Sequence, residues 1–258
     1  ANNCLASAGA VLVALPGLVE QSVSNPAGPF RPGTALTVSD TVLNDSPVSA
    51  AASTSKYYLS TDTVRNTGDV LLTGGRSVPS LGPSATSSGS ASVTIPATTA
   101  PGTYVLLACA DDTKVVVEGN ESNNCRASGT AITVMLPDLV EQSVVNPGGP
   151  FRPGATFTVS DTVLNDSLVG TPASSSTRYY LSADTVRNTG DILLTGARTV
   201  PILGPSASSS ASVAVTIPST TLPGTYFLLA CADDTKLVAE SNEANNCRAS
   251  GTAVVVAP

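Results

Sequence analysis

The chain has no histidine and no tryptophan, and only 4 % of its 258 residues are aromatic. Histidine is the side chain that most often acts as a general acid or base near neutral pH. No pair of acidic residues stands at a recognisable catalytic spacing either, so the sequence predicts that the protein is not an enzyme. A carbohydrate-binding module is a weaker alternative, because sugar platforms usually present exposed aromatic rings.

Charge is also scarce, since 12 % of the residues are charged, the formal net charge is −7 and the pI is about 4.4. A chain so poor in Lys and Arg lacks the positive surface that binds nucleic acid or anionic lipid. The longest apolar run, Val11–Leu15, is far shorter than the ~20 residues of a membrane-spanning helix. No basic stretch precedes this run, so no intact signal peptide is visible. The sequence therefore predicts neither nucleic-acid binding nor membrane insertion.

Five cysteines are present, and four of them form two pairs with the same spacing. The chain has neither the CxxC motif nor the histidine that a zinc site would use. We therefore predict disulfides between Cys109 and Cys125 and between Cys231 and Cys247. Disulfides persist in oxidising compartments, which predicts an extracellular or cell-surface location. The fifth cysteine, Cys4, has no evident partner.

A long internal repeat dominates the sequence. The segment LVEQSVSNPAGPFRPGTALTVSDTVLNDS begins at Leu18 and returns, with few changes, at Leu139. The segment GTYVLLACADDTK begins at Gly102 and returns as GTYFLLACADDTK at Gly224. A period of about 120 residues is the size of a whole domain. The predicted parts are an N-terminal strand over residues 1–16, a first domain over 17–136 and a second domain over 137–258.

Within each copy the apolar residues alternate with period two, which is typical of β-strands. Ser, Thr, Gly, Pro and Val are abundant, as expected for short strands and frequent turns. The predicted fold is all-β: two tandem immunoglobulin-like Greek-key sandwiches of about seven strands each, plus one extra N-terminal strand. Tyr104 and Tyr226 follow Pro-Gly-Thr, where either a tyrosine corner or an ordinary half-buried aromatic would stand. The strands predicted in the first copy are Leu18–Ser24, Ala35–Leu43, Thr54–Ser60, Val70–Val78, Ser90–Ile95, Gly102–Ala110 and Ala127–Met135.

Several motifs resemble those of a known family. The first strand contains PDLV in the second copy, the third begins YYLS, and the sixth reads GTY and then CAD. The acidic stretches VEGNESNN and VAESNEANN follow. Both copies resemble the CARDB-type adhesion-related domain nearly end to end. The resemblance implies an immunoglobulin-like fold in a secreted or surface protein; cysteines flanking the acidic stretch depart from the family pattern.

The first 15 residues repeat the seventh strand. Asn2-Asn3-Cys4 and the residues up to Pro16 align with Asn123-Asn124-Cys125 up to Pro137, and again with the segment starting at Asn245. The chain thus has two sets of strands one to six but three copies of strand seven. The predicted donor-strand residues are Leu5, Val11, Leu12, Val13 and Leu15.

A strand without a domain of its own exposes apolar side chains and unpaired backbone groups. Another subunit could accept it by strand addition, which would build a homopolymeric filament. Alternatively, the chain is cut from a longer array, as in a tandem stalk or adhesion segment of a larger surface protein, or the strand pairs within the first domain. If the segment takes the place of strand seven in a neighbouring subunit, Cys4 would be either a free thiol or a thiol that displaces an intradomain disulfide. The architecture resembles two-domain protomers of glycosylated extracellular fibrils, so the leading hypothesis is a filament subunit.

The acidic stretches offer oxygen ligands in the number that calcium takes. Their spacing does not match an EF-hand, and Asp and Asn are also common turn residues. We therefore expect no cofactor, with structural calcium as the alternative. The candidate ligands are Asp111, Asp112, Glu118, Asp233, Asp234 and Glu240.

Asp40 and Asp161 stand on apolar faces of predicted strands, where a carboxylate needs a partner. We expect a structural network that includes a Tyr hydroxyl, or a bulge that turns the side chain outward.

Three N-x-Ser triplets are candidate sites for covalent glycans, at Asn44, Asn120 and Asn165. In the second copy, Asn242 is followed by Glu243 and Ala244, so the triplet is lost there. The clusters Ser84–Ser92 and Ser206–Ser212 are either O-glycan sites or flexible polar loops.

Overall fold

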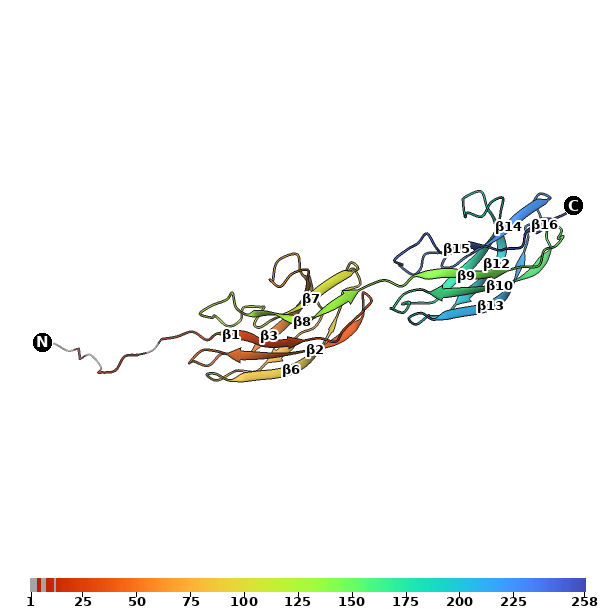
Figure 1. Cartoon of the computed structure of the whole chain (residues 1–258). Coiled ribbons are helices and arrows are strands. Elements are labelled where there is room, and N and C mark those ends of the chain that lie inside the picture. The colour runs from red at the N-terminus through yellow and green to blue at the C-terminus, as the bar shows by residue number, and fades with distance from the viewer. Residues whose placement is uncertain (1–3, 6–7, 12) are drawn as a thin grey trace. The chain divides into compact units, whose positions relative to one another are not determined.

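The computed structural model describes residues 4–5, 8–11 and 13–258, and every regular element in this part of the chain is a β-strand (Figure 1). No helix long and apolar enough to cross a membrane occurs among these residues. The chain divides into two compact units, the first ending at Val134 and the second covering Met135–Pro258. We call them domain 1 and domain 2. The predicted all-β fold is confirmed.

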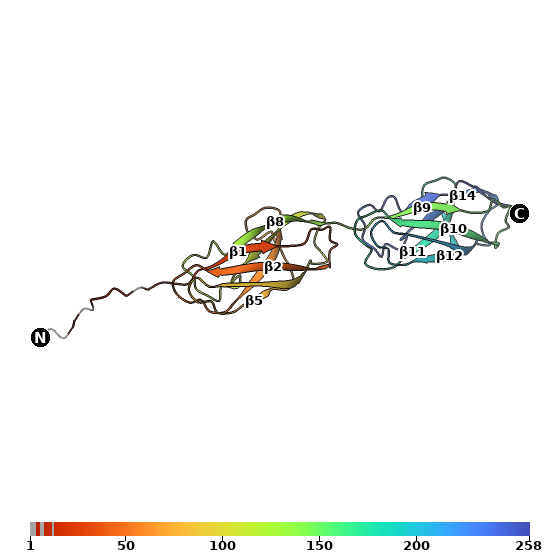
Figure 2. The same cartoon turned by 60° about the horizontal axis from the view of Figure 1, so that its bottom comes forward.

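Domain 1 is a sandwich of two antiparallel sheets (Figures 1 and 2). The first sheet has the order β1 (Leu18–Ser24), β2 (Ala35–Asn44), β6 (Thr86–Thr94). The second has the order β4 (Val70–Leu71), β3 (Ser53–Ser60), β7 (Gly102–Cys109), β8 (Cys125–Val134), with β5 (Arg76–Val78) also paired to β3.

Domain 2 repeats this arrangement. The strands β9 (Leu139–Val145), β10 (Thr156–Asn165) and β13 (Ser208–Thr216) form one face. The other face contains β12 (Ile192–Val200), β11 (Ser175–Ser182), β14 (Gly224–Cys231), and both β15 (Cys247–Ala249) and β16 (Val254–Val256) beside β14. A single residue pair, Thr195 with Thr216, joins the two faces through β12 and β13.

The core of each domain comes from the inward-facing residues of the alternating pattern. In β2, Leu36, Val38 and Val42 are at most 5 % exposed, while most residues between them face outward or are only partly covered. They pack against Tyr57 and Leu59 of β3 or against the cluster beside Leu18. Burying each such side chain stabilises the fold by ~1.5–3 kcal/mol. The period-two pattern is therefore sufficient to place both core faces.

The strand predicted over Val70–Val78 is wrong for domain 1, where it divides into β4 and β5. Its counterpart in domain 2, β12, is continuous. Gly74 and its counterpart Gly196 share a conformation that favours glycine, with φ 121° and 124°, so the difference lies at Gly75, where domain 2 has Ala197. Two consecutive glycines weaken the preference for extended backbone, so the strand is interrupted there.

Both domains contain a tyrosine corner. The Tyr104 hydroxyl donates to the Ala100 carbonyl at 2.8 Å, and the Tyr226 hydroxyl donates to the Leu222 carbonyl at 2.9 Å. Each bond ties the start of β7 or β14 to the preceding turn, as in immunoglobulin-like sandwiches.

Candidate functional site

The N-terminal segment exposes the apolar residues predicted to form a donor strand. Leu5 is 99 % exposed, Val11 84 %, Val13 89 % and Leu15 52 %. Leu12 lies outside the described residues. The described residues between positions 4 and 15 form no strand. Apolar side chains this exposed favour contact with another surface.

The repeat counterparts of Val11 and Val13 are core residues, whereas those of Leu5 are the exposed Arg126 and Arg248. Ile132 in domain 1 and Val254 in domain 2 stand at the repeat position of Val11, and both are 0 % exposed. Two positions further on, Val134 and Val256 are 1 % and 2 % exposed. The same sequence pattern is thus buried twice and exposed once in this chain.

The residues that follow the segment dock on domain 1 as the interdomain linker docks on domain 2. The Leu15 carbonyl accepts from Ser46 Oγ at 2.7 Å, and the Pro16 carbonyl accepts from the Gly119 N–H at 3.0 Å. The equivalent bonds in domain 2 run from Ser167 Oγ to the Leu136 carbonyl at 2.8 Å and from the Ser241 N–H to the Pro137 carbonyl at 2.9 Å.

The position of the seventh strand is filled differently in the two domains. In domain 1, β8 pairs with β7 along its length, from Cys125 to Val134, with one register shift. In domain 2 the equivalent segment divides into β15 and β16. Residues 250–253 between them belong to neither strand, and among them the Ser250 N–H donates to the Leu228 carbonyl of β14 at 2.8 Å. The other side of the seventh strand is bound alike in both domains, since the Phe30 N–H donates to the Thr133 carbonyl and the Phe151 N–H donates to the Val255 carbonyl, each at 2.8 Å.

Both predicted disulfides are present, between Cys109 and Cys125 and between Cys231 and Cys247. The first joins the end of β7 to the start of β8, and the second joins the end of β14 to the start of β15. In each pair the two cysteines are direct partners in the ladder. The disulfides fit an oxidising environment. Cys4, which stands at the repeat position of Cys125 and Cys247, is exposed and free.

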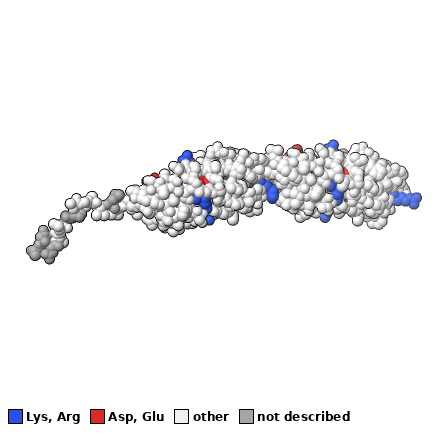
Figure 3. All heavy atoms as spheres, turned by 90° about the horizontal axis from the view of Figure 1, so that it is seen from below, with Lys and Arg blue, Asp and Glu red and all other residues white. Residues whose placement is uncertain are grey.

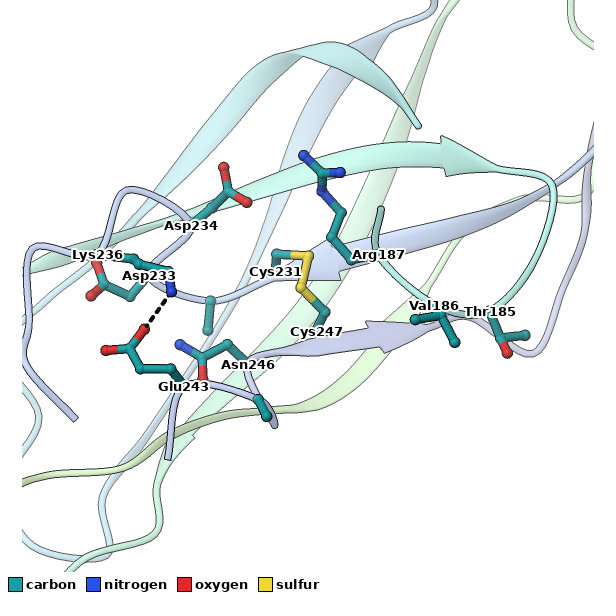
Figure 4. Close-up of a pocket in the computed structure, with 12 residues that line it drawn as sticks. Thr185, Val186, Arg187, Cys231, Asp233, Asp234, Lys236, Glu243, Asn246 and Cys247 are labelled. Carbon is teal, nitrogen blue, oxygen red and sulfur yellow. Dashed lines mark ion pairs between the residues drawn. A yellow bond between two sulfur atoms is a disulfide. The ribbon is translucent and has the colours of Figure 1, made fainter. Parts of the chain in front are cut away.

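A pocket of about 460 Å³ opens beside the disulfide of domain 2. The Cys231–Cys247 bond lies among the lining residues, with Arg187 close by and the ion pair between Lys236 and Glu243 on one side (Figure 4). Domain 1 has the same pocket beside its own disulfide, with a volume of about 480 Å³.

The carboxylates proposed as calcium ligands are each engaged in hydrogen bonds of the loop. In domain 1, Asp111 accepts from the N–H groups of Val115 and Val116 at 3.1 and 2.7 Å. Asp112 accepts from the Tyr58 hydroxyl at 2.7 Å. The same bonds recur in domain 2, where Asp233 accepts from Leu237 and Val238, and Asp234 from Tyr180.

The remaining pair of candidate ligands closes the loop onto the first strand. Glu118 accepts from the Leu18 N–H and from Asn124 Nδ2, and Glu240 does the same with Leu139 and Asn246. Burial raises the pKa of Glu118, and it raises the pKa of Glu240 to about 7. Among the described residues no three His, Cys, Asp or Glu side chains gather as a metal site. The calcium hypothesis stays a prediction.

Domain 1 contains a buried charge cluster between its sheets. Asp40, 3 % exposed, accepts from Arg76 Nε at 2.6 Å and Nη2 at 2.7 Å, and from the Tyr57 hydroxyl at 2.8 Å. Glu20, 1 % exposed, accepts from Ser55 Oγ at 2.9 Å, which also lies 3.2 Å from Asp40. Burial, then the neighbouring Asp40, raises the pKa of Glu20 to about 9. The predicted network with a Tyr hydroxyl is therefore present.

Domain 2 has the equivalent cluster. Asp161 accepts from Arg198 Nη2 at 2.6 Å and from the Tyr179 hydroxyl at 2.8 Å. Glu141 is 1 % exposed, and burial, then Asp161, raises its pKa to about 9. Thr177 stands at the repeat position of Ser55, and its buried hydroxyl has no hydrogen-bond partner among the described residues.

The arginines and glutamates of these clusters were not among the residues predicted from the sequence. The signal was period two: Arg76 alternates with the buried Val78 in β5, and Glu20 alternates with the buried Leu18 in β1. Both therefore point inward, where a charged residue requires a partner.

Two of the three predicted N-glycan sites are wrong for the folded domains. Asn44 and Asn165 are 0 % exposed. Asn44 Nδ2 donates to the carbonyls of Val48, Leu81 and Gly82 at 2.8 to 3.1 Å, which leaves no room for a sugar. Asn120 is exposed, and its Oδ1 accepts from Ser122, so this site stays a prediction.

On the face seen in Figure 3, Lys and Arg stand apart from one another rather than forming a basic patch.

The family assignment follows from a comparison with protein-family models. The CARDB model matches residues 15–128 and again 136–250. The chain belongs to the CARDB family. Its two CARDB domains coincide with the two immunoglobulin-like sandwiches. A search of curated proteins found no match.

Similar solved structures include two of a CARDB domain from Pyrococcus furiosus. A crystal structure, described as a complex with di-metal ions, has 24 % identity, covers 47 % of this chain and 90 % of its own, and has a TM-score of 0.33. A solution NMR structure has 22 % identity, coverages of 47 % and 96 %, and a TM-score of 0.33. Red sea bream transglutaminase has 14 % identity, coverages of 96 % and 32 %, and a TM-score of 0.29.

Proposed function

We propose that this tandem CARDB protein is the subunit of an extracellular filament. The N-terminal segment of one copy takes the place of the seventh strand in domain 2 of the next copy. The observation that carries the proposal is the exposure of Val11 and Val13, at 84 % and 89 %, against the nearly complete burial of their repeat counterparts. The role is structural rather than catalytic, and the two disulfides fit assembly outside the cell.

The N-terminal segment can replace β16 without changing the side chains that fill the core of domain 2. At the positions that are buried in β16, Val254 and Val256, the incoming segment also carries valine, at Val11 and Val13. Exchange of an equivalent element between copies costs little free energy, because the same side chains fill the same places in the core afterwards. The backbone ladder with β14 supplies the remaining hydrogen bonds, as in strand addition.

The docking of residues 15 and 16 supports a repeating junction. Leu15 and Pro16 make the same two hydrogen bonds to domain 1 that Leu136 and Pro137 make to domain 2. A junction between copies can thus use the same local contacts as the junction inside the chain. A donor at one end and an acceptor at the other do not close on themselves, so assembly continues as a filament.

The proposal is tested by the mass and shape of the assembled protein. We expect the full chain to form high-mass species in light scattering and filaments in negative-stain images. The double variant Val11→Asp, Val13→Asp should stay monomeric with unchanged thermal unfolding, because a buried unpaired carboxylate blocks docking in the acceptor core. The matched control is Val64→Asp, Val117→Asp, at positions 67 % and 71 % exposed, which should assemble normally.

A full chain that stays monomeric at every concentration would overturn the filament proposal. That result would favour the second candidate, a tandem immunoglobulin-like segment of a larger surface protein. The contacts of Leu15 and Pro16 fit this candidate too, because they are those of a linker that follows a preceding domain.

A further inference from the structure

We infer that the junction between copies is covalent: Cys4 of one copy forms a disulfide with Cys231 of the next copy and displaces Cys247. This inference rests on the proposed function, since it needs the donated strand in the place of β15 and β16. It assigns a role to Cys4, the exposed free thiol of the chain.

The register of the ladder places the two sulfurs together. Cys231 is the direct ladder partner of Cys247, and Tyr226 is the partner of Val254. A segment that sets Val11 in the position of Val254 also sets Cys4 in the position of Cys247, because both pairs are seven residues apart. The N-terminal segment therefore carries, at the same spacing as the strand it replaces, both the valines that fix the register and the cysteine that forms the disulfide.

One half of the acceptor disulfide is open to an incoming thiol. Cys247 is exposed, whereas Cys231, the residue that is attacked, is 1 % exposed, so its sulfur is reached as β15 separates from β14. Both cysteines line the pocket of about 460 Å³ in domain 2 (Figure 4). Domain 1 has the same pocket, but its seventh strand is an unbroken strand of ten residues, whereas that of domain 2 is interrupted at residues 250–253. An interrupted ladder can be displaced in two short steps, which favours domain 2 as acceptor.

The chemistry is a thiol–disulfide exchange that needs no external oxidant. The Cys4 thiol loses its proton, and the thiolate attacks Sγ of Cys231. The bond between Cys231 and Cys247 breaks, and Cys247 leaves as a thiolate that takes up a proton. One disulfide and one thiol are present before and after the step.

The covalent bond has a clear consequence for the filament. Exchange of valines for valines changes the buried apolar area very little, so burial alone does not favour the assembled state strongly. Strand exchange can then reverse by simple dissociation. After the exchange of disulfides, release of a copy requires a second attack by a thiolate, and uncatalysed rearrangements of this kind take minutes to hours.

The experiment uses the assembled full chain with its thiols blocked by iodoacetamide before denaturation. We expect a ladder of bands on a non-reducing gel that collapses to one band with reductant. Peptide mapping should give a cross-linked peptide joining Cys4 to Cys231, with Cys247 alkylated. Cys4→Ser should still form filaments in negative-stain images but should lose the ladder.

A second variant makes the test independent of the exchange step. Cys247→Ser leaves Cys231 without its internal partner, and assembly under air should join it directly to Cys4. Filaments in which Cys4 is alkylated and the bond between Cys231 and Cys247 is intact would overturn the inference and leave the proposed function standing. Absence of assemblies from wild type and from Cys4→Ser would overturn both.

Discussion

The two domains hold the same buried charges with different hydrogen bonds. In domain 1 the Ser55 hydroxyl lies between Glu20 and Asp40, within hydrogen-bond distance of both carboxyl groups. In domain 2, Thr177 stands in its place, and within the described part of the chain neither its hydroxyl nor the Glu141 carboxyl group has a side-chain partner. Both domains therefore keep the arginine, the aspartate and the tyrosine of the cluster, and domain 2 tolerates the loss of the bridging hydroxyl.

Both clusters contain two carboxyl groups and one guanidinium. Burial raises the pKa of Glu20 and of Glu141 to about 9, so near neutral pH each glutamate carries a proton. The aspartate and the arginine then form an ion pair, and the buried cluster has no net charge. An arrangement of this kind avoids the cost of an uncompensated buried carboxylate.

The largest expected effect comes from removing the arginine. Arg76→Met and Arg198→Met should each destabilise their domain by about 3–5 kcal/mol, because a buried aspartate loses its counter-ion. The loss should be greater in domain 2, where Asp161 retains the Tyr179 hydroxyl but Thr177 does not replace the bond that Ser55 makes. Urea titration followed by hydrogen exchange of peptides from each domain measures both values. Equal or reversed losses would contradict this account of the comparison.

The next effect, smaller within any one pH unit, is a decrease of stability with rising pH. Folding raises the pKa of Glu20 and Glu141 from about 4.5 to about 9, so between these values the folded chain holds protons that the unfolded chain has released. Stability should be greatest at the acidic side of this window and should fall up to pH 9, by at most about 1.4 kcal/mol per pH unit per carboxyl group.

Glu20→Gln and Glu141→Gln should reduce this dependence in their own domain, because an amide does not titrate. Domain 2 should keep a decrease below pH 7, because the pKa of Glu240 is also raised, to about 7. Unfolding midpoints at pH 6, 7.5 and 9 check the result. A midpoint that rises with pH in the wild type would show that the glutamates are ionised in the folded state.

A smaller effect on stability distinguishes the Ser55 hydroxyl of domain 1 from the Thr177 hydroxyl of domain 2. Ser55→Ala should destabilise domain 1 by about 1 kcal/mol or more, since hydrogen bonding to buried carboxyl groups is removed. Thr177→Val should leave domain 2 unchanged or slightly stabilised, because it replaces a buried hydroxyl, unpartnered among the described residues, with a methyl group of similar shape. Denaturant midpoints of the two variants give the comparison directly, and a clear loss in Thr177→Val would mean that the hydroxyl has a partner.

The smallest effect on stability concerns the exposed acidic loops. In a host that attaches N-glycans, Asn120 should carry a glycan, whereas the buried Asn44 and Asn165 should not. Ser122→Ala should remove the added mass, and Ala244→Ser should create a second site at Asn242, with no change in unfolding midpoint. Intact mass measures both, and a glycan at Asn44 would contradict the buried position of that side chain.

Local patterns were sufficient to predict much of this molecule. Period two indicated the strands and the core faces, and the repeat indicated the domains. The Pro-Gly-Thr-Tyr motif indicated where a tyrosine corner could stand, with an ordinary half-buried aromatic as the alternative. The predictions failed where a residue's role depends on a distant partner. The sequence predicts that Asn44 begins an exposed glycosylation triplet, but its side-chain amide donates hydrogen bonds to carbonyls 37 and 38 residues away. Arg76 finds Asp40 across 36 residues, a contact that no local pattern encodes.

The disulfides also set how far each domain can be stretched. Cys109 and Cys125, like Cys231 and Cys247, are 16 residues apart in the sequence. When the chain is pulled from its ends, the residues between each pair carry no tension while the bond is intact. Each domain should therefore unravel to a contour length shorter by about 50 Å, at roughly 3.4 Å per residue. Reductant would restore that length, so the redox state of the surroundings would determine how far each domain of the chain can be extended.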